Sequence, residues 1–321
     1  MAEAEQRLRL IYLGTPDFAA RILAHLLAWK GGEVVGVFTQ PDRPCGRGQV
    51  CRPPAVKRLA LEAGCAVFQP HRLAGEEELG LLRDLAPDLL VVAAYGLILP
   101  QAVLDIPPFG AVNVHASLLP KYRGAAPIQR AIMNGEPVTG VTIMQMEAGL
   151  DTGPILLQRA LAIGIDDTAA TLHDDLAELG GRLLVQALEK LTQGTLTSLP
   201  QDPERATYAP KLTKSEGQIS WDRPAREVHD HIRAVTPWPG SYFFWPGPGR
   251  KTPLRLTVFP GSIGPELEQD AAPGTFLGLV EDRLAVACRD RTYLLDRIQP
   301  AGGKPLMAKE FFCGFLSRCP T

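Results

Sequence analysis

The sequence predicts an α/β protein with a doubly wound, mainly parallel open sheet, followed by a C-terminal OB-like β-barrel domain. Strand-like and helix-like segments alternate over residues 1–190, which is the pattern of a sheet whose strands are joined by crossover helices. Roughly five short strand signals, separated by turns, follow within about 80 residues. The 321-residue chain is 45% hydrophobic and 21% charged, a globular composition that excludes disordered, collagen-like and coiled-coil classes.

The expected strands of the sheet are short apolar runs, and most are followed by a helix-like segment. The run at 88–94 is apolar on both faces, as in a parallel strand covered by helices on both sides. Thr15 can cap the first helix, and Pro16 suits its first turn. The expected strands are residues 9–13, 33–39, 65–69, 88–94 and 111–116, and the expected helices are residues 18–29, 54–63, 76–85 and 127–133.

Later segments complete the first domain and define a second. Two hairpin-like runs, 140–146 and 154–158, precede a long helix at 168–191 that has an apolar leucine face. We expect a disordered extension at 1–8, a first domain at 9–191, a polar linker at 192–220 and an OB-like domain at 221–321. In the last domain we expect a helix at 225–235 and strands at 241–245, 254–259, 274–280, 284–288 and 292–298.

Charge and motifs exclude several function classes. The net charge is −2, with 17 Lys/Arg against 21 Asp/Glu in residues 1–190 and 16 against 14 in the rest, a tilt too small to indicate nucleic acid by itself. The first strand-to-helix turn, Gly14-Thr-Pro-Asp-Phe18, lacks the Gly-x-Gly-x-x-Gly motif, and no Walker A loop occurs. NAD and ATP are therefore not expected ligands.

Cysteine spacing and hydropathy indicate the compartment. The six cysteines form no Cys-x-x-Cys pair, so no metal site is expected. The longest uncharged apolar stretch, 89–104, is interrupted and falls short of the roughly 20 residues that a membrane-spanning helix needs. The N-terminal segment MAEAEQRLRL is not typical of a signal peptide. We therefore expect a cytoplasmic protein with reduced thiols and no membrane partner.

Asn113 and His115 form the densest polar cluster in an otherwise apolar segment. Residues two apart in a strand project from the same face, so both side chains would lie near the carboxyl end of their strand. An Asn amide can donate to an oxygen that gains negative charge, and a His can move protons near neutral pH. The alternative is a hydrogen-bonded core pair that merely completes the strand.

Asp151 is the best candidate for a carboxylate that orients His115. It lies between Gly149 and Gly153, which permit close approach of the backbone to a ligand, although an Asp that only makes a local turn is equally compatible. Ser117 precedes Leu rather than the Gly of a nucleophile elbow, and no covalent machinery is evident. Asn113, His115 and Asp151 would suit direct attack by an external nucleophile on an acyl-like carbon.

A basic segment, residues 40–54, follows the second expected strand. Arg43 and Arg47 lie in it beside two glycines, and such a loop can bind phosphates or can be a solvated surface loop. The same two interpretations apply to Lys211 and Lys214 in the expected linker.

Two motifs resemble the signatures of the formyltransferases that use 10-formyltetrahydrofolate: Asn113–Ile128 (NVHASLLPKYRGAAPI) and Gly149–Gly153 (GLDTG). Further segments are similar to those of the members that formylate initiator methionyl-tRNA, so that the resemblance covers nearly the whole chain. These segments are GTPDF at 14–18, QPDRPCGRG at 40–48, YAPKLTK at 208–214 with Ser220-Trp221, and RAVTPWPG at 233–240. Cys45 and Cys51 depart from the family pattern.

The resemblance implies a formyl-folate-binding catalytic domain at 9–191 and a C-terminal domain that helps to hold tRNA. It implies Asn113, His115 and Asp151 as catalytic residues, and 10-formyltetrahydrofolate as a co-substrate without a metal. The implied folate-binding residues are Ser117, Leu118, Leu119 and Pro120, and the implied tRNA-binding residues are Arg43, Arg47, Lys211 and Lys214. Two rival functions are a formyltransferase for a small amine and an RNA-binding protein on an inactive scaffold. Small-amine enzymes have no evident use for the basic loop and the second domain, and the intact Asn, His and Asp set argues against the inactive scaffold.

Overall fold

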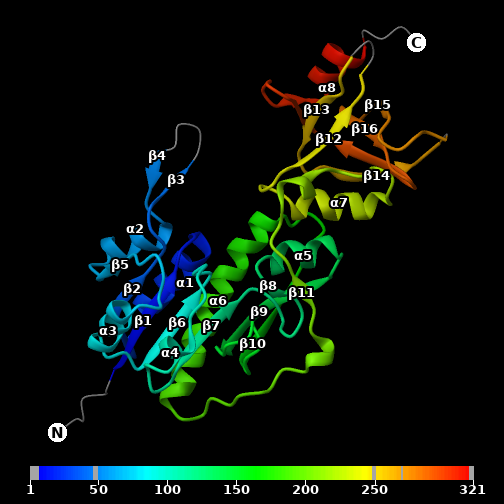
Figure 1. The fold of residues 1–321 in the computed structure, drawn as a ribbon. Helices are drawn as coiled ribbons and strands as arrows, with labels where there is room; N and C mark the ends of the chain where they lie inside the picture. Colours follow the sequence, from blue (N-terminus) through cyan, green and yellow to red (C-terminus); the bar gives the residue numbers. More distant parts are fainter. Residues whose placement is uncertain (1–6, 46–49, 248–250, 269, 318–321) are drawn as a thin grey trace. The chain divides into compact units, whose positions relative to one another are not determined.

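The computed structural model describes residues 7–45, 50–247, 251–268 and 270–317 (Figure 1). The chain divides into two compact units. Unit 1 comprises residues up to Pro127 together with Val138–Ala162 and His173–Ala209. Unit 2 comprises Ile128–Pro137, Ile163–Leu172 and the residues from Pro210 onward.

Unit 1 is built on a seven-stranded sheet with the order β10-β9-β7-β6-β1-β2-β5. The chain begins in the middle of the sheet at β1 and winds outward in both directions, and β5, β2, β1, β6 and β7 are parallel. β9 pairs antiparallel with both β7 and β10, so the sheet is mixed but mainly parallel, as predicted. The strands are Leu8–Gly14 (β1), Gly32–Phe38 (β2), Val67–Phe68 (β5), Leu89–Ala93 (β6), Ala111–His115 (β7), Val138–Gln145 (β9) and Ile155–Ala162 (β10).

Helices cover both faces of this sheet, which explains why its central strands are apolar on both sides (Figure 1). Ile11 and Leu13 of β1 pack into one cluster with residues of α3 and α4. The Tyr12 hydroxyl points to the other face, where it donates to the Ala19 carbonyl of α1 at 2.6 Å. The helices of unit 1 are Asp17–Ala28 (α1), Ala55–Glu62 (α2), Glu76–Asp84 (α3), Gln101–Leu104 (α4) and, from His173 onward, Ala169–Thr192 (α6). Helix α5 (Pro127–Met133) belongs to unit 2 from Ile128 onward.

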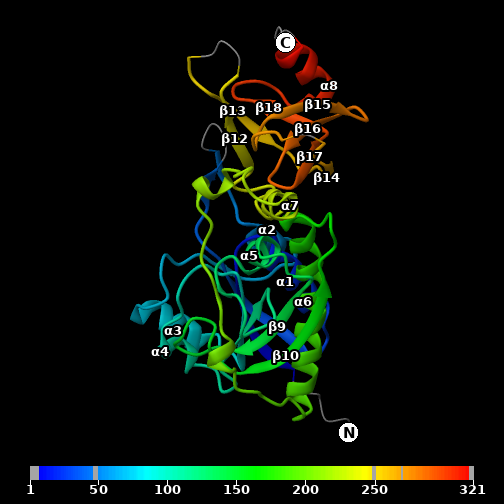
Figure 2. The same cartoon turned by 90° about the vertical axis from the view of Figure 1, so that its right-hand side faces the viewer.

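Helix α6 runs along the same face of the sheet as α1, as Figure 2 also shows. Two adjacent glycines allow this close packing. A Cβ atom on Gly180 would lie 2.9 Å from Val114 of β7, and one on Gly181 would overlap the His25 ring of α1. His25 also bonds Glu178 of α6 at 2.9 Å.

Unit 2 contains two antiparallel four-stranded sheets that share one apolar core, which confirms the predicted C-terminal antiparallel β domain. Trp221, Phe243 and Tyr293 lie in this core beside helix α7 (Ala225–Ala234) and the short helix α8 (Ala308–Phe311). One sheet comprises Ser241–Trp245 (β12), Leu254–Val258 (β13), Arg297–Pro300 (β18) and Leu306–Met307 (β19). The other comprises Ser262–Glu266 (β14), Arg291–Leu295 (β17), Arg283–Ala287 (β16) and Phe276–Val280 (β15).

A strap of residues 199–209, within the segment expected to be a linker, packs on the rest of unit 1. Leu199 exchanges two backbone hydrogen bonds of 2.8 Å with Ile155 of β10. At the other end of the strap, Tyr208–Ala209 (β11) pairs in parallel with Arg123–Gly124 (β8). Sequence periodicity indicated neither two-residue strand, because their pairing depends on contacts between distant segments.

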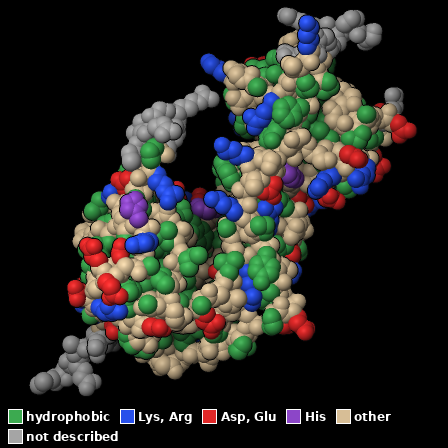
Figure 3. All heavy atoms as spheres, viewed as in Figure 1, with side chains coloured by type: hydrophobic (Ala, Val, Ile, Leu, Met, Phe, Trp, Pro, Cys, Tyr) green, Lys and Arg blue, Asp and Glu red, His purple; other side chains and the backbone are tan. Residues whose placement is uncertain are grey.

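Other boundaries also differ from the predictions. Leu8 is a buried residue of β1 and not part of a disordered extension, and residues 1–6 of that expectation lie outside the described residues. The basic segment contains a short antiparallel pair, Arg43–Cys45 (β3) and Val50–Arg52 (β4). Within the described part of the chain, no helix is long and apolar enough to cross a membrane. Positive and negative side chains are interspersed over the visible face of unit 1 (Figure 3).

Candidate active site

Asn113 and His115 lie on β7, at the carboxyl edge of the sheet, as their spacing predicted. Asn113 is opposite Met144 and His115 is opposite Thr142 of the antiparallel neighbour β9. The His115 side chain is only 6% exposed, whereas Asn113 is half-buried. Among the described residues, no group forms a hydrogen bond with the Asn113 amide, so its N–H groups are available to a ligand.

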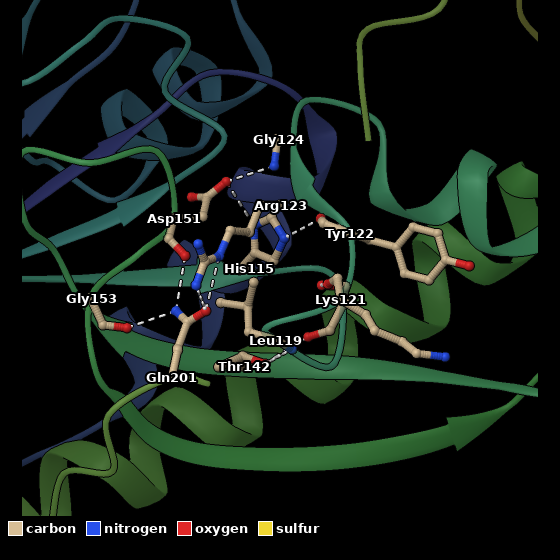
Figure 4. Close-up of polar contacts among 11 residues, drawn as sticks. His115, Leu119, Lys121, Tyr122, Arg123, Gly124, Thr142, Asp151, Gly153 and Gln201 are labelled. Carbon is tan, nitrogen blue, oxygen red and sulfur yellow. Dashed lines mark hydrogen bonds and ion pairs between the residues drawn. The ribbon is translucent and has the colours of Figure 1, made fainter. Parts of the chain in front are cut away.

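The two ring nitrogens of His115 have different partners (Figure 4). Nε2 lies 2.9 Å from the Tyr122 carbonyl oxygen, and Nδ1 lies 3.7 Å from Oδ2 of Asp151. A carbonyl oxygen can only accept, so Nε2 must carry the proton that it donates to Tyr122. In the neutral ring, Nδ1 is therefore the basic nitrogen, and a proton taken there faces the Asp151 carboxylate.

Asp151 lies in the loop between β9 and β10, with a backbone φ of +51°. This left-handed conformation is uncommon for residues other than glycine, but Asp tolerates it better than most. Oδ2 accepts a hydrogen bond of 2.8 Å from the Gly124 backbone N–H. The structure thus brings the Asp151 carboxylate close to His115, on the strand that also carries Asn113, and the roles of the three side chains are a proposal.

The turn after β7 is folded onto itself by side-chain hydrogen bonds. Ser117 is fully buried, and its hydroxyl donates to the Lys121 carbonyl at 2.6 Å. Thr142 of β9 donates to the Ser117 carbonyl and accepts from the Leu119 N–H. Of the four residues expected to bind folate, Ser117 and Leu119 are thus inside the protein, and the half-buried Leu118 and Pro120 reach the surface.

A further candidate segment, missed by the sequence reasoning, is the loop 94–100 that follows β6. Ala94 and Gly96 have positive φ angles, and the Tyr95 carbonyl accepts hydrogen bonds from Thr15 and from Gln40. Ile98 at its tip is 91% exposed. β6 adjoins β7 in the sheet, so this apolar loop leaves the same carboxyl edge that carries His115. The signal available in the sequence was a turn directly after a buried strand.

The start of the basic segment is held in place by hydrogen bonds of Asp42. Asp42 bonds Gln69 at 2.7 Å and Lys57 at 2.9 Å, and these hydrogen bonds hold the pKa of the Asp42 carboxyl below its usual value. Arg43 is exposed on β3, and Arg47 lies outside the described residues.

Lys211 and Lys214 are both exposed and belong to unit 2. The cysteines that depart from the family pattern are not cross-strand partners, because β3 and β4 pair Cys45 with Val50 and Cys51 with Pro44. Within the described ranges, no group of three His, Cys, Asp or Glu side chains could hold a metal ion.

Comparison with known families shows the class of protein, a formyl-transferring enzyme. The chain belongs to the formyl transferase family: residues 7–188 match the formyl transferase domain, and residues 211–316 match the formyl transferase C-terminal domain. The family resemblance inferred from the two sequence motifs is thereby confirmed.

Within this family, the chain is similar to proteins named methionyl-tRNA formyltransferase. It is 60% identical over 319 residues to that of Nitratidesulfovibrio vulgaris strain DP4, covering 99% of this chain and 96% of the relative. It is 50% identical over 305 residues to that of Pseudomonas fluorescens strain Pf0-1, covering 95% of this chain and 92% of the relative.

Solved structures share the fold at low sequence identity. HypX from Aquifex aeolicus in complex with tetrahydrofolic acid has a TM-score of 0.64 and 19% identity, over 98% of this chain and 48% of HypX. This chain thus spans about half the length of HypX. An N-formyltransferase from Helicobacter canadensis in complex with folinic acid and dTDP-3-aminofucose has a TM-score of 0.65 and 19% identity, over 90% of this chain and 98% of that one. Identities this low establish the fold alone.

Proposed function

We propose that this chain transfers the formyl group of 10-formyltetrahydrofolate to the α-amino group of initiator methionyl-tRNA, a step in translation initiation. The similarity to methionyl-tRNA formyltransferases over 99% of the chain supports both the reaction class and the acceptor. The observation that carries the chemistry is the placement of His115, which lies on the same strand as Asn113. Its Nδ1 faces the Asp151 carboxylate at a distance of 3.7 Å.

The acceptor amine must be neutral before it can attack the formyl carbon. A free α-amino group has a pKa of about 7.7–8.0, and the neighbouring ester of a charged tRNA lowers it further, so little base strength is needed. As the C–N bond forms, the formyl oxygen gains negative charge and the amine nitrogen gains positive charge. The Asn113 amide donates to that oxygen.

His115 moves the proton. Nδ1 takes it from the attacking amine and delivers it to the departing N10 of the folate, directly or through a water molecule. Asp151 stabilises the ring while it is positively charged, and the Nε2 bond to Tyr122 keeps the ring in one orientation.

Folate binding is assigned to the carboxyl edge beside β7. Leu118 and Pro120 remain accessible there, and the loop 94–100 adds the exposed Ile98. Apolar side chains can cover a flat ring while backbone groups satisfy its polar edge. Ser117 contributes by closing the turn through Lys121, so its effect on the folate is indirect.

The tRNA is assigned to the basic segment and to unit 2. Arg43 and Arg47 follow β2 in the sequence, and β2 is parallel to the strands β1, β6 and β7. A planar guanidinium can pair with phosphate or stack on a base. Lys211 and Lys214 would hold the backbone by charge, since both are exposed. The thiols of Cys65, Cys288 and Cys313 are free, as is usual in a reducing compartment, and we place the protein in the cytoplasm.

A formyl-transfer assay tests this function. The purified chain and 10-formyltetrahydrofolate are offered methionyl-tRNA, free methionine or an amino sugar, and we expect methionyl-tRNA to be the efficient acceptor. Asn113→Ala and His115→Ala should each lower the rate by roughly 10²–10³-fold, because each removes a group that meets charge formed in the transition state. Asp151→Asn keeps an acceptor for Gly124 and isolates the loss of the carboxylate charge.

Circular dichroism and unfolding curves verify that these variants are folded. Near-normal turnover by His115→Ala would disprove the proton-transfer role. Equal activity on free methionine would point instead to a small-amine enzyme. Activity that EDTA abolishes and zinc restores would contradict direct attack without a metal.

A further inference from the structure

The Gln201 side chain links three segments around the active site (Figure 4). Its Nε2 donates to the Asp151 carbonyl at 2.9 Å and to the Gly153 carbonyl at 2.7 Å. Its Oε1 accepts from Nε and Nη2 of Arg123 at 3.1 and 2.7 Å. Both N–H donors and both lone pairs of the amide are therefore used. Because carbonyls only accept and a guanidinium only donates, no carboxylate or ammonium group could replace this amide.

These hydrogen bonds hold both sides of the contact between Gly124 and Asp151. Gly124, which follows Arg123, donates its backbone N–H to the Asp151 carboxylate. Gln201 binds the Arg123 side chain on one side of that contact and the Asp151 backbone on the other. Arg123 is itself only 6% exposed, so the packing around it restricts the position of the guanidinium that Gln201 binds. The result is a closed ring of Gln201, Arg123, Gly124 and Asp151.

Gln201 fixes the end of the β9–β10 loop, and the part of this loop that precedes Asp151 is exposed to solvent. Residues 147–150 of the β9–β10 loop are exposed, and Leu150 is 61% exposed, whereas Asp151 turns inward with its left-handed backbone. The strap that carries Gln201 is anchored on both sides of it, by Leu199 to β10 and by Ala209 to the backbone of Ala125 and Ala126.

We propose that Gln201 is a positioning residue for formyl transfer, which fixes the Asp151 carboxylate relative to Nδ1 of His115. This inference rests on the proposed function. The Gln201 amide acts through Asp151 and touches neither His115 nor, on this assignment, the reacting atoms. A displacement of about 1 Å at a reacting centre can cost up to roughly 100-fold in rate, so a loosened Asp151 should lower kcat.

The test is Gln201→Glu, which preserves the shape and the acceptor for Arg123 but removes both donors to the loop. We expect kcat for methionyl-tRNA formylation to fall roughly 10- to 100-fold, while KM for tRNA and folate changes by less than about threefold. The matched control is Gln299→Glu in unit 2, where the amide donates to the Gly303 carbonyl at 2.8 Å, and it should leave kcat unchanged. Gln201→Met, which is neutral and similar in length, serves if the Glu variant does not unfold cooperatively.

A double-mutant cycle separates positioning from general stability. In an Asp151→Asn background, Gln201→Glu should cost less than about twofold in single-turnover rate, because the group through which it acts is already lost. An equal cost in both backgrounds, or wild-type kcat for Gln201→Glu, would overturn the proposal.

A readout independent of activity is hydrogen exchange of the Gly124 amide, which is bonded to Asp151. Exchange should accelerate in Gln201→Glu, and unchanged protection would refute the positioning role even if the wild-type chain proved inactive on methionyl-tRNA. Failure of the wild type to formylate this substrate would instead count against the proposed function.

Discussion

At the residue scale, His229 is buried, and its hydrogen-bond partners favour the neutral imidazole over the charged one. Its Nε2 lies 2.6 Å from the Ile165 carbonyl, and its Nδ1 lies 3.1 Å from the Tyr293 hydroxyl. That hydroxyl also accepts from the Gly261 N–H, so its own proton points to His229. A second proton on the ring, at Nδ1, would therefore face the hydroxyl proton of Tyr293. Burial lowers the pKa of His229 below its ordinary value, opposed in part by the Ile165 carbonyl.

This burial predicts a pH dependence of stability in unit 2. Below the unfolded pKa of about 6.5, the unfolded chain binds a proton that folded His229 does not bind, so the free energy of unfolding must fall as pH falls. One such group contributes at most about 1.4 kcal/mol per pH unit. His229→Gln can retain both hydrogen bonds but does not titrate, so the loss of stability between pH 6.5 and 5 should be smaller. Denaturant unfolding followed by tryptophan fluorescence measures this slope.

The exposed His71 provides the control, since His71→Gln makes the same chemical change without a buried ring. It should leave the slope unaltered. Burial also lowers the pKa of His231, so part of the slope should survive in His229→Gln. A slope identical to that of the wild type would show that His229 is protonated in the folded protein.

At the element scale, the packing of α6 against α1 depends on a glycine that the apolar pattern of α6 did not single out. A Cβ on Gly181 would lie 2.2 Å from Cδ2 of His25, and near the base of that side chain as well. Gly181→Ala should therefore destabilise unit 1 by about 1–3 kcal/mol through overpacking, which outweighs the gain in helix propensity.

Gly80 of α3 is the matched comparison, because a Cβ there would meet no atom within 4 Å. Gly80→Ala should raise stability by up to about 1 kcal/mol, since alanine is the better helix former. Chemical unfolding of the two variants under one condition tests the opposite signs. A gain in stability for Gly181→Ala would mean that α1 and α6 can separate without cost.

Most elements were predictable because their signals are local. The five parallel strands and the helices α1, α2 and α3 follow from apolar runs and turn residues, and each lies within a few residues of its predicted position. The four-residue helix α4 was not predicted. The short pairs β3–β4 and β8–β11 were not predictable. Two or three residues carry no periodicity, so neither the local pair β3–β4 nor the pair β8–β11 has a sequence signal. The pair β8–β11 exists because two segments distant in sequence meet.

At the scale of the whole molecule, a net charge of −2 means that a polyanion must be recognised by local features and not by the overall field. The basic segment is such a feature. Arg43→Ala should raise KM for methionyl-tRNA about tenfold while folate binding is unchanged, because Arg43 is assigned to the tRNA alone. Loss of one phosphate contact should also lower the slope of log K against log salt by about 0.7–1.

Lys30→Ala removes one exposed positive charge just before β2, at the amino end of that strand and thus away from the carboxyl edge. It should change neither KM nor the salt slope. Steady-state kinetics with charged tRNA and a separate folate titration provide both measurements. If Arg43→Ala behaves like Lys30→Ala, the basic segment is only a solvated surface loop.

The sequence by itself determined the sheet, the second domain, the family and the identity of Asn113, His115 and Asp151 as candidates. Alternation of strands and helices is a local pattern, and two residues of one strand share a face whatever surrounds them. The motif around Asn113 is contiguous and could be compared directly with a family.

Only the tertiary structure decided how these residues meet. The 3.7 Å approach of Asp151 to Nδ1, the tautomer set by Tyr122 and the four bonds of Gln201 join segments from three parts of the chain. Gln201 lies in a polar stretch that resembles any linker, so no periodicity distinguishes it. Its role depends on the strap lying across a loop, and such contacts are fixed by sheet order and by hydrogen bonds between distant groups, which no local pattern encodes.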